Sequence, residues 1–252
     1  MDKKEKIRVI ILAGGKGNRM RSELPKVLTK LRGESMIKHL LSSVQTSGVD
    51  ARPLIVVGYG KEAVMNELGD KYDYATQSEQ LGTGHAVAVA ERILKNKADH
   101  VVVLYGDHPF VSSETIKKLV EKHSDSKGKI TMATVKLPDF EDWRNVFYAN
   151  FSRIIRDAKG NITKDVQFKD ANIEEKKVTE VNPCYFCFEA DWLWEKLKTL
   201  NTNNAQKEYY LTDLVKIAMQ EKTKIESINI EPREALGVNS KEELEILEKM
   251  IS

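Results

Sequence analysis

Short apolar runs alternate along the first half of the chain with segments whose apolar residues recur every three or four positions. The apolar runs predict strands at 7–12, 53–57, 72–76, 100–105 and 130–136. The periodic segments predict helices at 36–46, 61–68, 83–94 and 114–123, with Ser113 as the cap of the last one. Strands and helices that alternate at this spacing predict an α/β fold with a mostly parallel central sheet and helices on both faces.

The second half has a different pattern, with longer strand-like stretches. Residues 146–156, 161–168 and 181–188 predict strands of a partly antiparallel extension, and 225–230 predicts a further strand of the main sheet. Helices are expected at 191–200, 211–220 and 241–250. Because no stretch rich in Pro, Gly or Ser separates the halves, we expect a single domain over residues 1–252.

Composition limits the partners of the chain. Its 252 residues are 41% hydrophobic and 31% charged, which is sufficient for a large core and an ordinary polar surface. The net charge of +2, from 40 basic and 38 acidic residues, provides no overall attraction for nucleic acid or anionic membranes. The charged start at residues 2–6 is unlike a signal peptide, and no apolar run reaches the roughly 18 residues of a membrane span. We therefore expect a cytoplasmic protein.

Two cysteines, Cys184 and Cys187, form a C-x-x-C pair. A zinc site would need two more ligands nearby, and a thioredoxin-type motif would open a helix. Residues 183–188 instead predict a strand, in which positions three apart point to opposite faces. We interpret both cysteines as packed core residues.

A glycine-rich loop follows the first strand: Leu12-Ala13-Gly14-Gly15-Lys16-Gly17-Asn18-Arg19-Met20, then Leu24-Pro25-Lys26-Val27-Leu28. The glycines allow a close backbone approach, and Lys16, Arg19 and Lys26 supply positive charge, which is the chemistry of a polyphosphate site. A solvated turn between strand and helix is the alternative. The spacing excludes both a P-loop and a G-x-G-x-x-G dinucleotide fingerprint.

Polar residues also follow other predicted strands, at the sheet edge where α/β proteins bind ligands. The Gln77 amide suits a nucleobase edge, and Gly82-Thr83 offers backbone groups, or a cap for the next helix. Asp107 offers carboxylate oxygen to a hard cation, with a turn cap as the alternative. Asn239, otherwise a simple helix cap, would be a neutral second ligand of the same ion.

Together these motifs resemble the uridylyltransferase domain of bacterial N-acetylglucosamine-1-phosphate uridylyltransferases, and more widely the nucleotide-sugar pyrophosphorylases. The matching strings are the two of the glycine-rich loop, Gln80-Leu81-Gly82-Thr83-Gly84-His85-Ala86, Tyr105-Gly106-Asp107, Asn203-Asn204-Ala205-Gln206, Glu208-Tyr209-Tyr210-Leu211-Thr212-Asp213 and Gly237-Val238-Asn239. The resemblance implies a Rossmann-like, three-layer nucleotidyltransferase (GT-A-like) fold. Its nucleotide-binding half would span about 1–136 and its sugar-phosphate-binding half about 137–252.

The resemblance also implies roles for individual residues. The nucleoside would be bound by Leu12, Ala13, Gly14, Gly15, Gln77, Gly82 and Thr83, and the phosphates by Lys16, Arg19 and Lys26. Asp107 and Asn239 would bind Mg²⁺, and Asn182 would contact the sugar beside Tyr105. Lys26, Arg19 and Asp107 would be the catalytic residues.

The sugar half departs from the family pattern. The family's Gly-Tyr-Gly-Arg is Asn150-Phe151-Ser152-Arg153, its sugar-binding glutamate aligns with Gln167, and its Asn-Thr-Gly is Asn182-Pro183-Cys184. Residues 138–149 have no clear counterpart. These changes indicate weaker affinity for the family's sugar, or a different sugar. We also expect a chain without the acetyltransferase domain that often follows in this family, as a monomer or homodimer.

The expected reaction is Mg²⁺-dependent transfer from UTP to N-acetylglucosamine 1-phosphate or a related hexose 1-phosphate, giving a UDP-sugar and pyrophosphate. The attacking phosphate is already an anion, so positioning and charge neutralisation suffice without a general base. A cytidylyltransferase on the same fold is an alternative, because the Gln77 amide can face either pyrimidine. A non-catalytic nucleotide-binding protein is another. A glycosyltransferase would show Asp-x-Asp, which Asp107-His108-Pro109 lacks.

Overall fold

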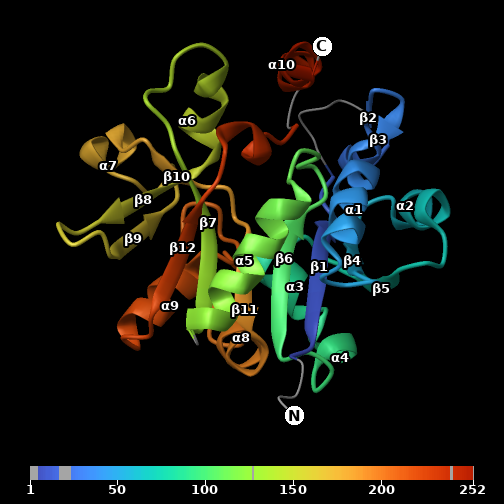
Figure 1. Ribbon diagram of the computed structural model, residues 1–252, viewed down its shortest axis with the longest axis horizontal. Helices are drawn as coiled ribbons and strands as arrows, with labels where there is room; N and C mark the ends of the chain where they lie inside the picture. The colour runs from blue at the N-terminus through green and yellow to red at the C-terminus, as the bar shows by residue number, and fades with distance from the viewer. Residues whose placement is uncertain (1–4, 17–23, 127, 239–240, 252) are drawn as a thin grey trace.

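In the computed structural model, which describes residues 5–16, 24–126, 128–238 and 241–251, one large mixed sheet runs through the molecule (Figure 1). The strands are β1 Ile7–Ala13, β2 Lys30–Leu31, β3 Glu34–Ser35, β4 Leu54–Val57, β5 Asp73–Thr76, β6 His100–Tyr105, β7 Ile130–Lys136, β8 Ser152–Arg156, β9 Ile162–Val166, β10 Glu180–Asn182, β11 Phe186–Glu189 and β12 Ile225–Asn229. The α-helices are α1 Met36–Ser47, α2 Lys61–Leu68, α3 Thr83–Ala88, α4 Glu91–Leu94, α5 Ser113–Ser126, α6 Val146–Asn150, α7 Ile173–Lys177, α8 Ala190–Leu197, α9 Asp213–Gln220 and α10 Lys241–Ile251. Short 3-10 helices are η2 Lys26–Leu28, η3 Asp142–Asn145 and η4 Pro232–Ala235.

The strand order is β5-β4-β1-β6-β11-β7-β10-β8-β9, with β12 beside β7. Strands β5, β4, β1 and β6 are parallel, and β12 is parallel to β7. Strand β11 lies antiparallel between β6 and β7, and β10, β8 and β9 form an antiparallel extension. The predicted mixture of a mostly parallel sheet with a smaller antiparallel part is confirmed.

Helices cover both faces of the sheet, which gives three layers (Figure 1). Side chains of α1, α2 and α5 pack on one face, and those of α3, α4, α8 and α9 pack on the other. Strand β6 shows why the central strands are apolar at successive positions. Its Val102 and Leu104 belong to the first core and Val101 and Val103 to the second, and all four are at most 1% exposed.

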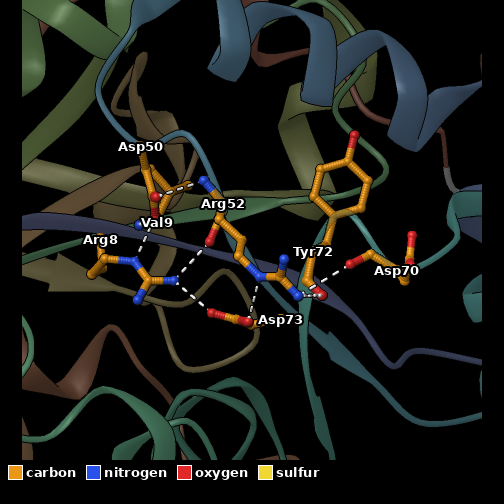
Figure 2. A network of polar contacts seen from close by, with 7 residues as sticks. All are labelled: Arg8, Val9, Asp50, Arg52, Asp70, Tyr72 and Asp73. Carbon is orange, nitrogen blue, oxygen red and sulfur yellow. Dashed lines mark hydrogen bonds and ion pairs between the residues drawn. The ribbon is translucent and has the colours of Figure 1, made fainter.

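A charge network joins the amino-terminal ends of neighbouring strands (Figure 2). The guanidinium of Arg8 at the start of β1 donates to Asp50 at 2.9 Å and to Asp73, the first residue of β5, at 2.9 Å. Arg52, just before β4, donates to the other oxygen of Asp73 at 2.8 Å. These contacts fix β1, β4 and β5 relative to one another at the edge opposite their carboxyl ends.

Two predicted strands proved wrong in part. Residues 146–150 form α6 instead of extended chain, because the buried Arg153 guanidinium donates to carbonyls at the end of that helix, Tyr148 at 2.5 Å and Phe151 at 2.7 Å. The stretch 181–188 splits into β10 and β11, because Cys184 adopts a φ of 65° and its N–H donates to the Asn182 side chain at 2.6 Å. Cys184 therefore lies in a turn, while Cys187 is fully buried, and both are free thiols.

Two helix predictions also need correction. The helix expected at 83–94 is two helices, because the backbone hydrogen bonds tighten at Ala90, whose N–H donates to Val87 at 3.0 Å. Ser113 is the first residue of α5 and not its cap. The cap is Ser112, whose hydroxyl accepts from the N–H of Thr115 at 3.0 Å. Across the described part of the chain, each helix is too short or too polar to cross a membrane.

Candidate active site

A cavity of about 520 Å³ opens where β1, β5 and β6 end. It is lined by Leu12, Ala13, Gly14, Gly15, Lys26, Val27, Gln77, Gln80, Gly82, Thr83, Ala86, Tyr105, Asp107 and Glu208. Parallel strands bring their carboxyl ends to one edge, so loops far apart in sequence meet there. Most of the residues expected to bind a nucleotide therefore line a single cavity.

Lys26 and Asp107 form an ion pair in this cavity. Lys26 opens η2 after Pro25, and Asp107 follows β6. Their side chains are 13% and 15% exposed, so solvent screens the pair only partly. Burial alone would raise the pKa of Asp107. The charges of Lys26 and His108, together with hydrogen bonds from Lys26 and from the backbone, outweigh burial and hold the pKa below its ordinary value. Asp107 is therefore an ionised carboxylate at neutral pH.

The Gln77 amide is held in one orientation at another wall of the cavity. Its Nε2 donates to the Gly82 carbonyl at 3.1 Å and lies 3.2 Å from Nδ1 of His85 on α3. The Oε1 atom faces Gly14, where a Cβ would lie 3.1 Å from it. Gln77 is 5% exposed, so its amide lies in a nearly dry wall of the cavity. Sequence reasoning missed His85 as the residue that orients Gln77.

The loop before α9 completes the cavity by packing against Gly82. Gly82 has a φ of 109°, and a Cβ there would lie 2.7 Å from the Tyr209 carbonyl. Gly84 N–H donates to that carbonyl at 2.8 Å, and the Thr83 hydroxyl accepts from Leu211 N–H at 3.0 Å. Thr83 therefore anchors this loop instead of capping its own helix. The packing brings Glu208 into the cavity, a residue whose only sequence signal was its place in a matching string.

Three further residues were expected at the site: Lys16, Arg19 and Asn239. Lys16 is exposed and is not among the residues that line the cavity, and its ammonium lies 5.4 Å from the ring centre of Tyr59. Arg19 and Asn239 lie outside the described residues. The described chain reaches Val238, whose N–H donates to the Asp107 carbonyl at 3.2 Å. This contact places the segment that leads to Asn239 against the Asp107 loop.

The residues expected to contact a sugar form a separate polar cluster on the antiparallel extension. Ser152 opens β8 and is paired with Asn182 at the end of β10. Asn182 Nδ2 donates to Asp165 Oδ2 at 2.7 Å, and Gln167 Nε2 donates to the Thr212 hydroxyl at 2.9 Å. None of these lines the cavity. Of the expected sugar residues, Tyr105 alone does, and its hydroxyl lies beside the side chains of Thr83 and Cys184.

Among the residues that the structure describes, no three His, Cys, Asp or Glu side chains come together in an arrangement that would hold a metal ion. A site around Asp107 would thus need oxygen from outside that set, such as an amide, water or phosphate.

Comparison with known proteins identifies a matching family and similar relatives. Residues 9–210 match the family model described as a MobA-like NTP transferase domain. The Bifunctional protein GlmU of Clostridium botulinum (strain Loch Maree / Type A3) is 40% identical over 93% of this chain and 50% of its own length. That of Streptococcus agalactiae is 41% identical over 96% of this chain and 51% of its own. The chain thus spans about half the length of these curated relatives.

The fold also matches a solved structure. A Bacillus anthracis protein assigned as a glucose-1-phosphate thymidylyltransferase superposes with a TM-score of 0.75, over 97% of this chain and 94% of the other. Its sequence identity is 16%, so this likeness concerns the fold alone. The resemblance drawn from the motifs is confirmed by the first two relatives. With residues 9–210 matched, the chain belongs to the family of MobA-like NTP transferase domains.

Proposed function

We propose that this chain transfers a nucleotidyl group from a nucleoside triphosphate to a sugar 1-phosphate and releases pyrophosphate. The nucleotide proposed is UTP, and the acceptor is N-acetylglucosamine 1-phosphate or a related hexose 1-phosphate. The family membership supports the reaction class. The observation that carries the proposal is the Lys26–Asp107 ion pair, enclosed in the same cavity as the oriented amide of Gln77.

The geometry suits an in-line displacement. A phosphate oxygen of the acceptor attacks the α-phosphorus, the bond from that phosphorus to the bridging oxygen of the β-phosphate breaks, and pyrophosphate leaves. Both reactants are anions, so their repulsion is the main obstacle. The Lys26 ammonium reduces it, while Gln77 and the backbone at Gly14 and Gly82 orient the base. No side chain has to remove a proton.

Asp107 fits the role proposed for it as a ligand of Mg²⁺. Its carboxylate is ionised, lies in the cavity, and offers the hard oxygen that Mg²⁺ prefers. Asn239 is proposed as the second ligand, supported by the contact of neighbouring Val238 with Asp107. When bound, Mg²⁺ would neutralise phosphate charge, and two protein oxygens suffice because this ion keeps water and phosphate ligands.

Pyrophosphate release tests the reaction. We would assay UTP, CTP, ATP and GTP against a panel of sugar 1-phosphates. Release that depends on both a nucleotide and a sugar phosphate supports the proposal, and a preference for CTP would favour a cytidylyltransferase. Nucleotide binding without any release would indicate a binding protein and contradict the proposal.

Asp107→Ala tests the metal assignment separately. It should abolish turnover and weaken Mn²⁺ binding in the presence of nucleotide, measured by electron paramagnetic resonance, while the melting temperature stays near that of the wild type. Glu62→Ala, an exposed acid in the first turn of α2, is the control. Unchanged rates and Mn²⁺ binding in Asp107→Ala would contradict the assignment.

A further inference from the structure

A half-buried carboxylate that neither the motifs nor the cavity lining singled out lies at the centre of the polar cluster on β8, β9 and β10. Asp165 is the next-to-last residue of β9, opposite Ile154 of β8. Its Oδ2 accepts from Asn182 Nδ2 at 2.7 Å. Gln167 follows two residues later, just beyond the end of β9.

Two enclosed polar atoms of this cluster have incomplete hydrogen bonding. Neither Asp165 Oδ1 nor the hydroxyl of Ser152 makes a well-formed hydrogen bond among the described residues, although the hydroxyl lies near enough to the carboxylate to stabilise its charge. Ser152 is 1% exposed, whereas Asp165 on β9 and Gln167 just beyond it remain partly exposed. Enclosed polar atoms without partners are costly. The cluster therefore holds an acceptor and a hydroxyl that a ligand could still bind, and Asp165 is partly exposed on β9.

The charge around Asp165 makes a ligand donor more favourable still. Burial raises the pKa of Asp165 to about 7, and the Asp213 carboxylate on α9 adds to the increase, while nearby Ser152 and Asn182 oppose it. The Cys184 thiol also faces it, and burial raises the pKa of that thiol well above its ordinary range. No cation is among the groups that act on Asp165 in the described structure. A donor from a ligand would supply what the protein does not.

The cluster adjoins the cavity through one residue. Tyr105 lines the cavity, and its hydroxyl lies beside the Cys184 side chain. The N–H of Cys184 donates to Asn182 Oδ1 at 2.6 Å, and Asn182 holds Asp165. A ligand whose phosphate lies near Lys26 and Asp107 would extend past Tyr105 toward this cluster.

We propose that Asp165 is a specificity-determining residue of the acceptor subsite, where its carboxylate accepts a hydrogen bond from a hydroxyl or amino group of the sugar phosphate. This inference rests on the proposed function. It implies that Asp165 of β9, together with Ser152, recognises the sugar of the acceptor. Acceptors would then be selected by the hydrogen-bond donors that they present to these residues. A hydrogen bond to a charged group is worth roughly 1.5–3 kcal/mol, or about 10- to 150-fold in affinity.

Asp165→Asn keeps the shape and removes the charge. We expect kcat/KM for the best acceptor to fall by about 10- to 100-fold while KM for the nucleotide stays within about twofold. Glu174→Gln, an exposed acid on α7 of the same half, should change neither constant. Raising the pH from 6 to 8 should improve acceptor use more in the wild type than in Asp165→Asn. Ionisation of the acceptor phosphate is common to both proteins and cancels in the comparison.

Deoxy analogues of the best acceptor locate the donor. The wild type should use one of these analogues with a kcat/KM as low as that of Asp165→Asn with the parent sugar. Asp165→Asn should show no further fall in kcat/KM when it is given that analogue. Unchanged acceptor constants in Asp165→Asn, or equal losses for nucleotide and acceptor with a lowered melting temperature, would overturn the inference.

Calorimetry separates this inference from the proposed function. If the wild type releases no pyrophosphate with any acceptor, the proposed function fails. Titration of glucosamine 1-phosphate, glucose 1-phosphate and N-acetylglucosamine 1-phosphate into both proteins then decides the role of Asp165. Binding that is weaker in Asp165→Asn supports that role, and equal binding or none contradicts it.

Discussion

Removing the ammonium group of Lys26 should slow nucleotidyl transfer much more than it weakens the fold. Lys26→Met keeps a long, flexible side chain and removes the positive charge. Among the described residues that line the cavity, no other lysine or arginine is present. The reacting phosphates would then face Asp107 without a neighbouring lysine.

The magnitude follows from the enclosure of the pair. With side chains 13% and 15% exposed, the site lies between bulk water and a dry interior. At an effective dielectric constant of about 20, two unit charges roughly 4 Å apart interact by about 4 kcal/mol. Water that enters the cavity in place of the ammonium would replace up to half of this stabilisation. The transition state would then lose about 2–4 kcal/mol of stabilisation, which corresponds to a fall in kcat of about 30- to 1,000-fold.

The assay is the initial rate of pyrophosphate release at saturating nucleotide and acceptor, with the melting temperature measured in parallel. Lys38→Met is the matched control, because Lys38 pairs with Glu67 on the surface, where both side chains are more than a third exposed. Such a pair contributes little, so its kcat should stay within about twofold of the wild type. A Lys26→Met enzyme that keeps more than a third of the wild-type kcat would refute the electrostatic reasoning.

Three further predictions concern other parts of the molecule. Gly82→Ala should destabilise the protein by about 2–5 kcal/mol in urea unfolding, because its φ of 109° and a 2.7 Å approach to Tyr209 both exclude a Cβ. Gly69→Ala, at a φ of 74° in open space, should cost less, and equal costs would count against the close approach. Gln167→Glu should raise kcat/KM for N-acetylglucosamine 1-phosphate by about tenfold if the sugar is the family's own. A lower value would indicate a different sugar. Burial, reinforced by His100, lowers the pKa of His123 to about 4. The unfolded chain therefore binds the extra proton first, and about 3 kcal/mol of stability should be lost as the pH falls from 6.5 to 4. An equally steep loss in His123→Gln would show that other groups cause it.

The sequence by itself determined most of the parallel part of the fold. The structure has β6, β7 and α2 at the predicted residues, because a strand buried on both faces must be apolar at successive positions and a surface helix must be apolar on one side. The sequence also predicted that Gly14, Gln77 and Asp107 lie at one edge of the sheet, since the loops that follow parallel strands converge, and all three line the cavity. Local pattern and topology agree there, so the nucleotide side could be predicted.

The sequence predicted a partly antiparallel extension, but the tertiary structure alone decided how its strands pair and how its polar cluster forms. The apolar pattern of 181–188 indicates burial but not the partner strand, and the chain changes partners at Cys184. Asp165 is an ordinary polar residue of an alternating strand until Asn182 and Asp213 surround it. Periodicity records how far each residue is buried, whereas the pairing of strands and the ionisation of a buried carboxylate depend on groups far away in the chain. Those become neighbours only after folding.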